Sequence, residues 1–162
     1  MARLPSARFL TPTPGAPAAP VDVPSDPRSW ANVLADVPIF AELSDRHVRK
    51  VAGTGRIQKF HEGAQIILEG TPGDALYVLL DGQVDVQRRG LPVIPLGIGA
   101  FFGEMALFDD SPRSATVVAR VPALCLVITR SRLHKLLRSE PAIALGLLKE
   151  LARRLRVAQS IV

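Results

Sequence analysis

The stretch from Phe101 to Val117 reads FFGEMALFDDSPRSATV and places one acid, Glu104, and one base, Arg113, between apolar runs. Glu104 follows Gly103 at the start of a short apolar segment that reads as a short helix. Glycine lets a ligand approach the backbone closely, and the first amide groups of a helix have no partner within that helix. The stretch therefore has the residue types of an anion-binding site.

The separate groups indicate what such an anion would carry. The amides of Met105 and Ala106 would attract negative charge, and the planar guanidinium of Arg113 suits a phosphate. The carboxylate of Glu104 would repel an anion, so we expect it to accept a hydrogen bond from a ligand hydroxyl. The pattern favours a ligand with one phosphate and one free hydroxyl on a compact apolar frame. The alternative is a salt bridge between Glu104 and Arg113 that only closes the loop.

Other kinds of chemical site find no support in the residue pattern. His47, His61 and His134 lie far apart and form no HxH pair, and Cys125 is the only cysteine. We find no paired nucleophile and base and no glycine-rich phosphate loop between a strand and a helix. We therefore expect no catalytic residues, no metal site and no resident cofactor, and we expect Cys125 to be a buried apolar residue.

The surrounding segment has the pattern of antiparallel strands. Short β-rich runs alternate with Glu-Gly, Pro-Gly-Asp and Asp-Gly turn signals roughly every 8 to 12 residues. The runs are Gln65–Leu68, Ala75–Leu80, Gln83–Arg88 and Val93–Leu96, and ATVVARVPALCLVITR adds two strands bent near Pro122. The predicted fold class is α+β and mainly β: an antiparallel β-barrel or jelly roll over residues 56–130, flanked by helices.

Helical patterns precede and follow the barrel. Residues 30–53 read as helical, with Ser44 as the N-cap of a helix from Asp45 to Ala52 and Gly53 as its end. Residues 131–160 read as C-terminal helices.

In this C-terminal region, Ser131 would cap a short helix, and Pro141 suits the first turn of a long one. Apolar residues of the long helix recur at steps of four and three and form one stripe, which must pack on the body or on another chain. The stripe comprises Ala144, Leu148, Leu151, Leu155, Ala158 and Val162, widened by Leu145 and Leu147.

Residues 1–29 are rich in proline and are expected to form an extended, poorly ordered tail. The alternative is a proline-rich docking strip. The sequence contains neither an apolar run that could span a membrane nor a signal-peptide pattern, so we expect a cytoplasmic protein. The net charge is +5, but from Arg130 onward eight Lys and Arg residues face two acids, so the excess belongs to the C-terminal helices.

Two motifs together resemble those of cyclic nucleotide-binding domains. FGEMAL at Phe102–Leu107, followed by PRSATV at Pro112–Val117, resembles the phosphate-binding cassette of that family; residues 102–117 are named the cassette below. Gly70, Gly73-Asp74, Tyr77-Val78 and Gly82 resemble the family's glycine and GDxxYV pattern. VPIFAELS resembles the start of the family's domain, so the resemblance runs from about Asp36 to the last helix, within a domain expected over 30–162.

The resemblance implies a role for each matching residue. Glu104 would bind the ribose 2′-hydroxyl, and Arg113 would pair with the cyclic phosphate, helped by the amides of Ala106 and Ser114. Asp74 would support the arginine, and Leu107 would be the apolar hinge that moves when the cassette tightens. The implied ligand-binding residues are Phe102, Gly103, Glu104, Met105, Ala106, Arg113, Ser114 and Ala115, with Val86 on the barrel wall near the base.

The resemblance also implies a stand-alone receptor that passes occupancy through its C-terminal helices to an unknown effector protein. In the family, serine after the arginine occurs in cAMP-binding bacterial activators, so Ser114 favours cAMP over cGMP. The lid over the base would come from the last helix, with Leu151, Arg154 and Leu155 as candidates.

Several partner and function alternatives stay open. A homodimer through the last helix is one, whereas no DNA or membrane partner is expected, because we find no helix-turn-helix after the last helix. The alternative functions are a ligand-independent interaction module with a degenerate pocket, the sensory part of a transcription regulator that lacks its helix-turn-helix, and a cyclic nucleotide hydrolase.

Overall fold

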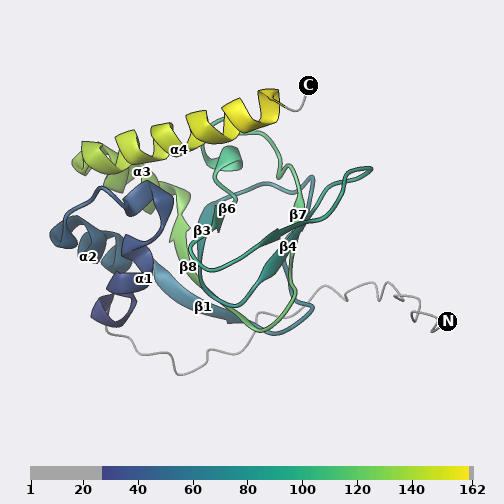
Figure 1. Cartoon of the computed structure of the whole chain (residues 1–162), viewed down its shortest axis with the longest axis horizontal. Helices are drawn as coiled ribbons and strands as arrows, with labels where there is room; N and C mark the ends of the chain where they lie inside the picture. Colours follow the sequence, from purple (N-terminus) through teal and green to yellow (C-terminus); the bar gives the residue numbers. More distant parts are fainter. Residues whose placement is uncertain (1–26, 161–162) are drawn as a thin grey trace.

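The computed structural model describes residues 27–160. Of the tail expected over residues 1–29, residues 1–26 lie outside the described residues, and the last three belong to a short 3-10 helix, η1 (Pro27–Trp30). Its strands form two four-stranded antiparallel sheets (Figure 1), in the orders β1-β8-β3-β6 and β2-β7-β4-β5. The strands are β1 (Arg56–Phe60), β2 (Gln65–Ile67), β3 (Ala75–Asp81), β4 (Val84–Gln87), β5 (Ile94–Leu96), β6 (Phe101–Phe102), β7 (Thr116–Ala119) and β8 (Ala123–Thr129). The predicted jelly roll is confirmed.

The turn between β3 and β4 shows how local sequence sets this topology. The Asp81 carboxylate accepts a hydrogen bond of 2.9 Å from the Gly82 amide. Gly82 has a φ of +91°, and a Cβ at this position would lie 2.3 Å from the Pro122 carbonyl oxygen. Glycine is therefore required where this turn meets the bend between β7 and β8.

Helices cover one side of the β1-β8-β3-β6 sheet. The chain enters through η1 (Pro27–Trp30), α1 (Ala31–Ala35), η2 (Pro38–Phe40) and α2 (Asp45–Thr54), carries η3 (Met105–Leu107) in the cassette, and ends with α3 (Arg130–Ser139) and α4 (Pro141–Gln159). Figure 1 shows α1 and α2 beside β1 and β8, with α4 lying across the top of the view. Helices α3 and α4 both contact the cassette, through His134 and Arg154 respectively.

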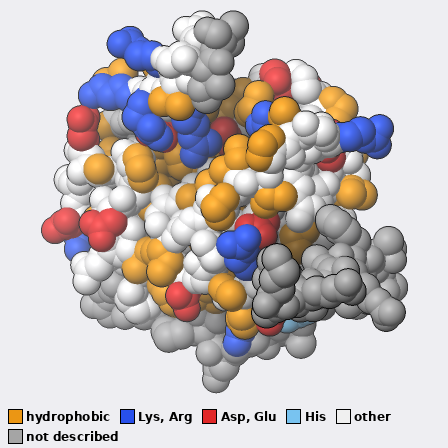
Figure 2. All heavy atoms as spheres, turned by 45° about the vertical axis from the view of Figure 1, so that its right-hand side comes forward, with side chains coloured by type: hydrophobic (Ala, Val, Ile, Leu, Met, Phe, Trp, Pro, Cys, Tyr) orange, Lys and Arg blue, Asp and Glu red, His pale blue; other side chains and the backbone are white. Residues whose placement is uncertain are grey.

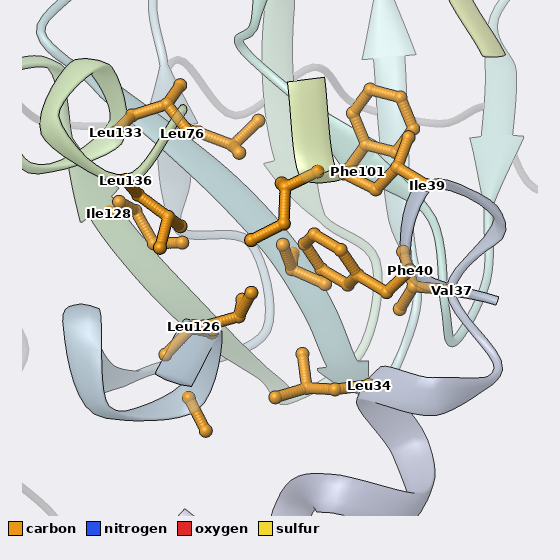
Figure 3. Close-up of a cluster of buried hydrophobic side chains, with 14 of the residues drawn as sticks. Leu34, Val37, Ile39, Phe40, Leu76, Phe101, Leu126, Ile128, Leu133 and Leu136 are labelled. Atoms are coloured by element: carbon orange, nitrogen blue, oxygen red, sulfur yellow. The ribbon is translucent and has the colours of Figure 1, made fainter. Parts of the chain in front are cut away.

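The main hydrophobic cluster lies between these helices and the sheet. Figure 3 shows Leu34 of α1 and Phe40 of η2 close to Leu126 of β8, with Phe101 of β6 nearby. Full burial of one such side chain stabilises a fold by about 1.5–3 kcal/mol. Because Phe101 immediately precedes the cassette, the same core that holds the helices also fixes the start of the cassette.

A second cluster fills the space between the two sheets. It includes Leu79, Val84, Phe102 and Cys125, of which Cys125 is fully buried. Burial raises the pKa of the Cys125 thiol to about 12. The expectation that this cysteine is a buried apolar residue is confirmed.

Two of the predicted helix boundaries are wrong. Ser44 caps α2 as predicted, but the helix continues through Gly53 to Thr54. There is open space around Gly53, so nothing forces the helix to end there. Gly55 lies against β8, where a Cβ would be 2.7 Å from the Leu126 side chain, and the helix ends just before this contact.

At the other end of the barrel, α3 begins at Arg130 with Thr129 as its N-cap, so Ser131 lies inside the helix and does not cap it. The reason is that the Arg130 amide already donates to the Asp74 carbonyl oxygen at 2.6 Å, so β8 leads into α3 without a loop. Pro141 occupies the first turn of α4, as predicted.

Helix α4 packs on the body with a face that overlaps the predicted stripe only in part. Its buried residues are Ile143, Leu147 and Glu150. Leu148 and Leu155 of the stripe are 62% and 60% exposed. The body-packing face is fixed by η2, because a Cβ at Gly146 would lie 2.4 Å from the Ile39 carbonyl oxygen. Of the predicted stripe, Leu147 is buried and Leu151 packs against the main hydrophobic cluster, whereas Leu145, Leu148 and Leu155 are exposed and Val162 lies outside the described residues.

Candidate functional site

A cavity of about 670 Å³ lies between the cassette, the β4–β5 hairpin and α4. All nine predicted ligand-binding residues line it: Val86, Phe102, Gly103, Glu104, Met105, Ala106, Arg113, Ser114 and Ala115. Figure 2 shows hydrophobic side chains gathered across the middle of one face of the molecule, with Lys and Arg side chains beside them. The fold thus brings together segments from β4 to β7 and the last helix.

Arg113 is the most deeply buried cation of this cavity, with only 6% of its surface exposed. It donates through Nη1 to the Gly103 carbonyl oxygen at 2.7 Å and through Nη2 to the Ala75 carbonyl oxygen at 3.0 Å. Burial lowers the pKa of Arg113, while Tyr77 and Asp74 raise it. A desolvated cation held by neutral carbonyls gains most from an anionic ligand, because a buried charge without a counterion is costly.

Two glycines make room for this guanidinium. Gly103 has a φ of +83°, and a Cβ there would lie 2.6 Å from Arg113 Nη1. A Cβ at Gly73 would lie 2.7 Å from Arg113 Nε and 2.6 Å from the Ala106 Cβ. The glycines of both sequence motifs therefore meet at one arginine.

Glu104 does not pair with Arg113. It is buried, and its Oε1 accepts a hydrogen bond of 2.9 Å from Nη1 of Arg154 on α4. Arg154 also donates to the Phe101 carbonyl oxygen at 3.1 Å, and its guanidinium lies 3.9 Å from the centroid of the Phe101 ring. The alternative of a Glu104–Arg113 salt bridge is therefore wrong, and the acid of the cassette is joined to the last helix instead.

The charges on α4 form a small network at the cavity. Glu150 is buried and accepts hydrogen bonds from Arg153 at 2.9 and 2.6 Å and from Arg154 at 3.3 Å. The hydrogen bond from Arg153, followed by the charges of both arginines, lowers the pKa of Glu150. Sequence reasoning named Arg154 only as one of three lid candidates and missed its partner, because the two residues are 50 positions apart.

The wall opposite the arginine is apolar. Val86, Ile94, Leu96 and Ile98 of the β4–β5 region line the cavity, and Ile94 and Ile98 are more than half exposed. Such a wall suits a flat apolar group such as a nucleobase. Ser114 Oγ has Met105 Sδ, 4.0 Å away, as its nearest hydrogen-bond partner, so its hydroxyl can still bond to a ligand.

The two predicted supporting residues lie outside the cavity lining. Asp74 adds negative charge near Arg113, but the hydrogen bonds of Arg113 go to other groups. Leu107 is 1% exposed, and its carbonyl oxygen lies 3.0 Å from Nε2 of His134 on α3. Neither residue therefore contacts the cavity directly, and their supporting roles stay predictions.

The lid candidates of α4 separate by position. Arg154 lines the cavity, together with Arg153 and Val157. Leu151 packs against the main hydrophobic cluster, and Leu155 is exposed. Arg154 is therefore the one of the three candidates that faces the site.

Within residues 27–160 we find no cluster of three or more His, Cys, Asp or Glu side chains that could hold a metal ion. A search of the same residues finds no helix that is both long and apolar enough to span a membrane.

Comparisons with known proteins agree with this geometry. Residues 57–140 match the family model described as the cyclic nucleotide-binding domain. The cAMP-dependent protein kinase regulatory subunit of Aspergillus niger is 36% identical over 112 residues, which are 68% of this chain and 27% of that protein. The cGMP-dependent protein kinase of Eimeria tenella is 38% identical over 104 residues, 64% of this chain and 10% of that protein. The chain thus spans about a quarter or less of the length of these relatives.

A solved structure shares the arrangement. The catabolite activator protein of Thermus thermophilus superposes with a TM-score of 0.71 at 34% sequence identity, over 75% of this chain and 60% of that one.

Proposed function

Because this chain belongs to the cyclic nucleotide-binding domain family, we propose that it is a receptor that binds cAMP and passes its occupancy to an effector protein without catalysing a reaction. The observation that carries the proposal is the buried Arg113, which has no carboxylate within ion-pair distance among the described residues and lines the cavity beside Glu104. An anion with a nearby hydroxyl would satisfy both side chains.

In this proposal the cyclic phosphate binds Arg113 and the amides of Ala106 and Ser114, which lie around the same part of the cavity. The ribose 2′-hydroxyl donates to Glu104. The base lies along the apolar wall that includes Val86, with Arg154 of α4 above it. This pose uses four lining residues of the cassette: Glu104, Ala106, Arg113 and Ser114.

The choice between cAMP and cGMP depends on Ser114 and is the finer part of the proposal. The two relatives named above include one cAMP-dependent and one cGMP-dependent protein, so relatedness alone leaves both nucleotides open. The serine at this position favours cAMP through the family resemblance. Its free hydroxyl would also reach a guanine amino group in a syn base, so cGMP is expected to bind more weakly but measurably.

Signalling would run through α4. The Arg154 guanidinium bonds to one oxygen of Glu104, so a ribose hydroxyl must share or displace this contact. A ligand shifts a conformational equilibrium only when it prefers one arrangement. The resulting movement of α4 would change the exposure of its apolar surface, which includes Leu145, Leu148 and Leu155 and would receive an effector or a second copy of the chain.

Calorimetric titration with cAMP and cGMP tests the proposal. We expect saturable heat with both nucleotides and tighter binding of cAMP, and we expect mass spectrometry of the denatured, freshly purified protein to detect a bound cyclic nucleotide. If neither nucleotide gives heat or a thermal shift at millimolar concentration, the proposal is wrong and the ligand-independent interaction module is favoured. Loss of cAMP during prolonged incubation would instead favour the hydrolase.

A further inference from the structure

Arg130 lies behind the cavity and holds three segments together. Its Nη2 donates to the carbonyl oxygens of Gly73 at 2.8 Å and Ala106 at 2.6 Å, and its Nη1 forms an ion pair with Asp110. Its own amide donates to the Asp74 carbonyl oxygen at 2.6 Å. Arg130 is the first residue of α3, so one side chain connects the β2–β3 loop, η3 and the cassette turn to the start of a helix.

Each of these contacts acts on the proposed phosphate site. Gly73 fits between Ala106 and the Arg113 guanidinium, since a Cβ there would collide with both. The backbone N–H of Ala106 is assigned above to the phosphate. The backbone carbonyl of the same residue accepts a hydrogen bond from Arg130. A phosphate that pulls on Ala106 therefore also pulls on Arg130.

Asp110 adds a second sign that this contact fixes a particular shape of the cassette. Its φ is +55°, and it is the one non-glycine residue with positive φ among residues 27–160. Its side chain is 82% exposed, so burial does not hold it in place. Non-glycine residues adopt this conformation at a cost, which neighbouring contacts must offset. Aspartate tolerates this conformation better than most residues, and the ion pair with Arg130 ties its side chain to the start of α3.

We propose that Arg130 is the positioning residue that couples closure of the cassette around its ligand to movement of α3. This inference rests on the proposed function. Arg130 is the first residue of α3, so a displacement of its side chain acts on the start of that helix. No loop lies between β8 and α3 to absorb the displacement. His134, one turn further along α3, adds a second contact to the cassette at the Leu107 carbonyl. The helix pair α3 and α4 then moves as the ligand tightens Ala106.

The test compares Arg130→Gln with Arg138→Gln, a matched change at an exposed arginine on the same helix. Both variants are titrated with cAMP, and their hydrogen exchange is measured with and without cAMP. We expect Arg130→Gln to bind cAMP about tenfold more weakly, since hydrogen bonds to charged groups are lost. We also expect cAMP to protect the cassette amides of this variant while leaving α3 and α4 unchanged, whereas Arg138→Gln and the wild type show protection in all three segments.

A purely structural role predicts a different result, in which Arg130→Gln is less stable but cAMP still changes α3 and α4 as in the wild type. That result would overturn the inference and leave the proposed function intact. Should Arg130→Gln fail to fold, Arg130→Lys and Asp110→Asn serve instead: the first keeps the charge but cannot reach all three acceptors, and the second removes only the ion pair. Both are expected to reduce the response of α3. If the wild type binds no cyclic nucleotide, the proposed function and this inference both fail.

Discussion

Arg113 and the two glycines beside it depend on one another. The guanidinium fits only because Gly73 and Gly103 carry no Cβ, and it donates in turn to the Gly103 carbonyl oxygen. The sequence motif predicted the cation and the glycines separately. The structure adds that they form one unit, so substitutions at either kind of residue should affect the same property.

Replacing Arg113 tests the cation directly. Removal of one partner of a desolvated, hydrogen-bonded charge pair costs about 2–5 kcal/mol, so Arg113→Ala should weaken cAMP binding roughly 30-fold to several thousand-fold. Arg113→Lys keeps the charge but loses the fork that bonds to Gly103 and Ala75, and should lie between the wild type and Arg113→Ala. Calorimetric titration of all three proteins measures this order. Equal affinities would exclude Arg113 from the ligand site.

Replacing Gly103 separates backbone strain from steric conflict. Gly90 has a φ of +75° and open space around it, so Gly90→Ala should lower the free energy of unfolding by only about 1–2 kcal/mol. Gly103→Ala adds a conflict with Arg113 and should be more destabilising and weaken cAMP binding as well. Chemical denaturation and titration of both variants provide the comparison. A Gly103→Ala variant that matched Gly90→Ala in both measurements would contradict this account.

Helix α4 carries the contacts that sequence patterns did not reveal. The predicted stripe ran through Leu148 and Leu155, which are exposed, whereas the buried face runs through Ile143, Leu147 and Glu150, of which only Leu147 was in the prediction. Hydrophobic periodicity could not separate the two faces, because both are apolar over much of the helix. The decision comes from Gly146 against η2 and from Arg154 against Glu104, which are tertiary contacts between distant segments.

The Arg154–Glu104 pair should affect stability and binding in opposite senses. Arg154→Ala leaves the buried Glu104 carboxylate without this partner and should lower the free energy of unfolding by about 1–3 kcal/mol. A ribose hydroxyl can then bond to the freed carboxylate, and we expect this gain to exceed the loss of the Arg154 contact to the base, so saturating cAMP should raise the melting temperature of Arg154→Ala more than that of the wild type. Differential scanning calorimetry with and without cAMP checks this. Arg156→Ala, on the exposed part of the same helix, is the control.

Glu150 should make the attachment of α4 sensitive to acid. Its pKa is lowered in the folded protein, chiefly by the hydrogen bond from Arg153. Its contribution to stability is therefore complete above the unfolded pKa, which is about 4.3, and is lost as the pH falls through the lower folded value. Glu150→Gln should lose less stability than the wild type between pH 6 and about pH 3. Urea denaturation across this range gives the comparison, and parallel curves would show that Glu150 does not contribute.

For the molecule as a whole, local patterns were sufficient for the fold class. Turn signals predicted six of the eight strands in residues 27–160, all but β1 and β6, and the family resemblance named nine residues, eight from the cassette and Val86, that line one cavity. That these residues bind a ligand stays a prediction. The errors concern features that depend on distant partners: the helix ends at Gly55 and Arg130, the packed face of α4, and the partner of Glu104. Short-range sequence propensity does not determine these features, because each depends on a contact with a segment that is distant in the sequence.

Cys125 gives the chain its own reporter of transient opening. It is the sole thiol, it is fully buried between the sheets, and a pKa of about 12 leaves almost no reactive thiolate at neutral pH. Alkylating reagents should therefore modify the native protein only when the sandwich separates. The half-life of labelling then measures how often the two sheets separate, without an added probe. Bound cAMP stabilises the closed form and should lengthen this half-life, and the more so the more tightly cAMP binds.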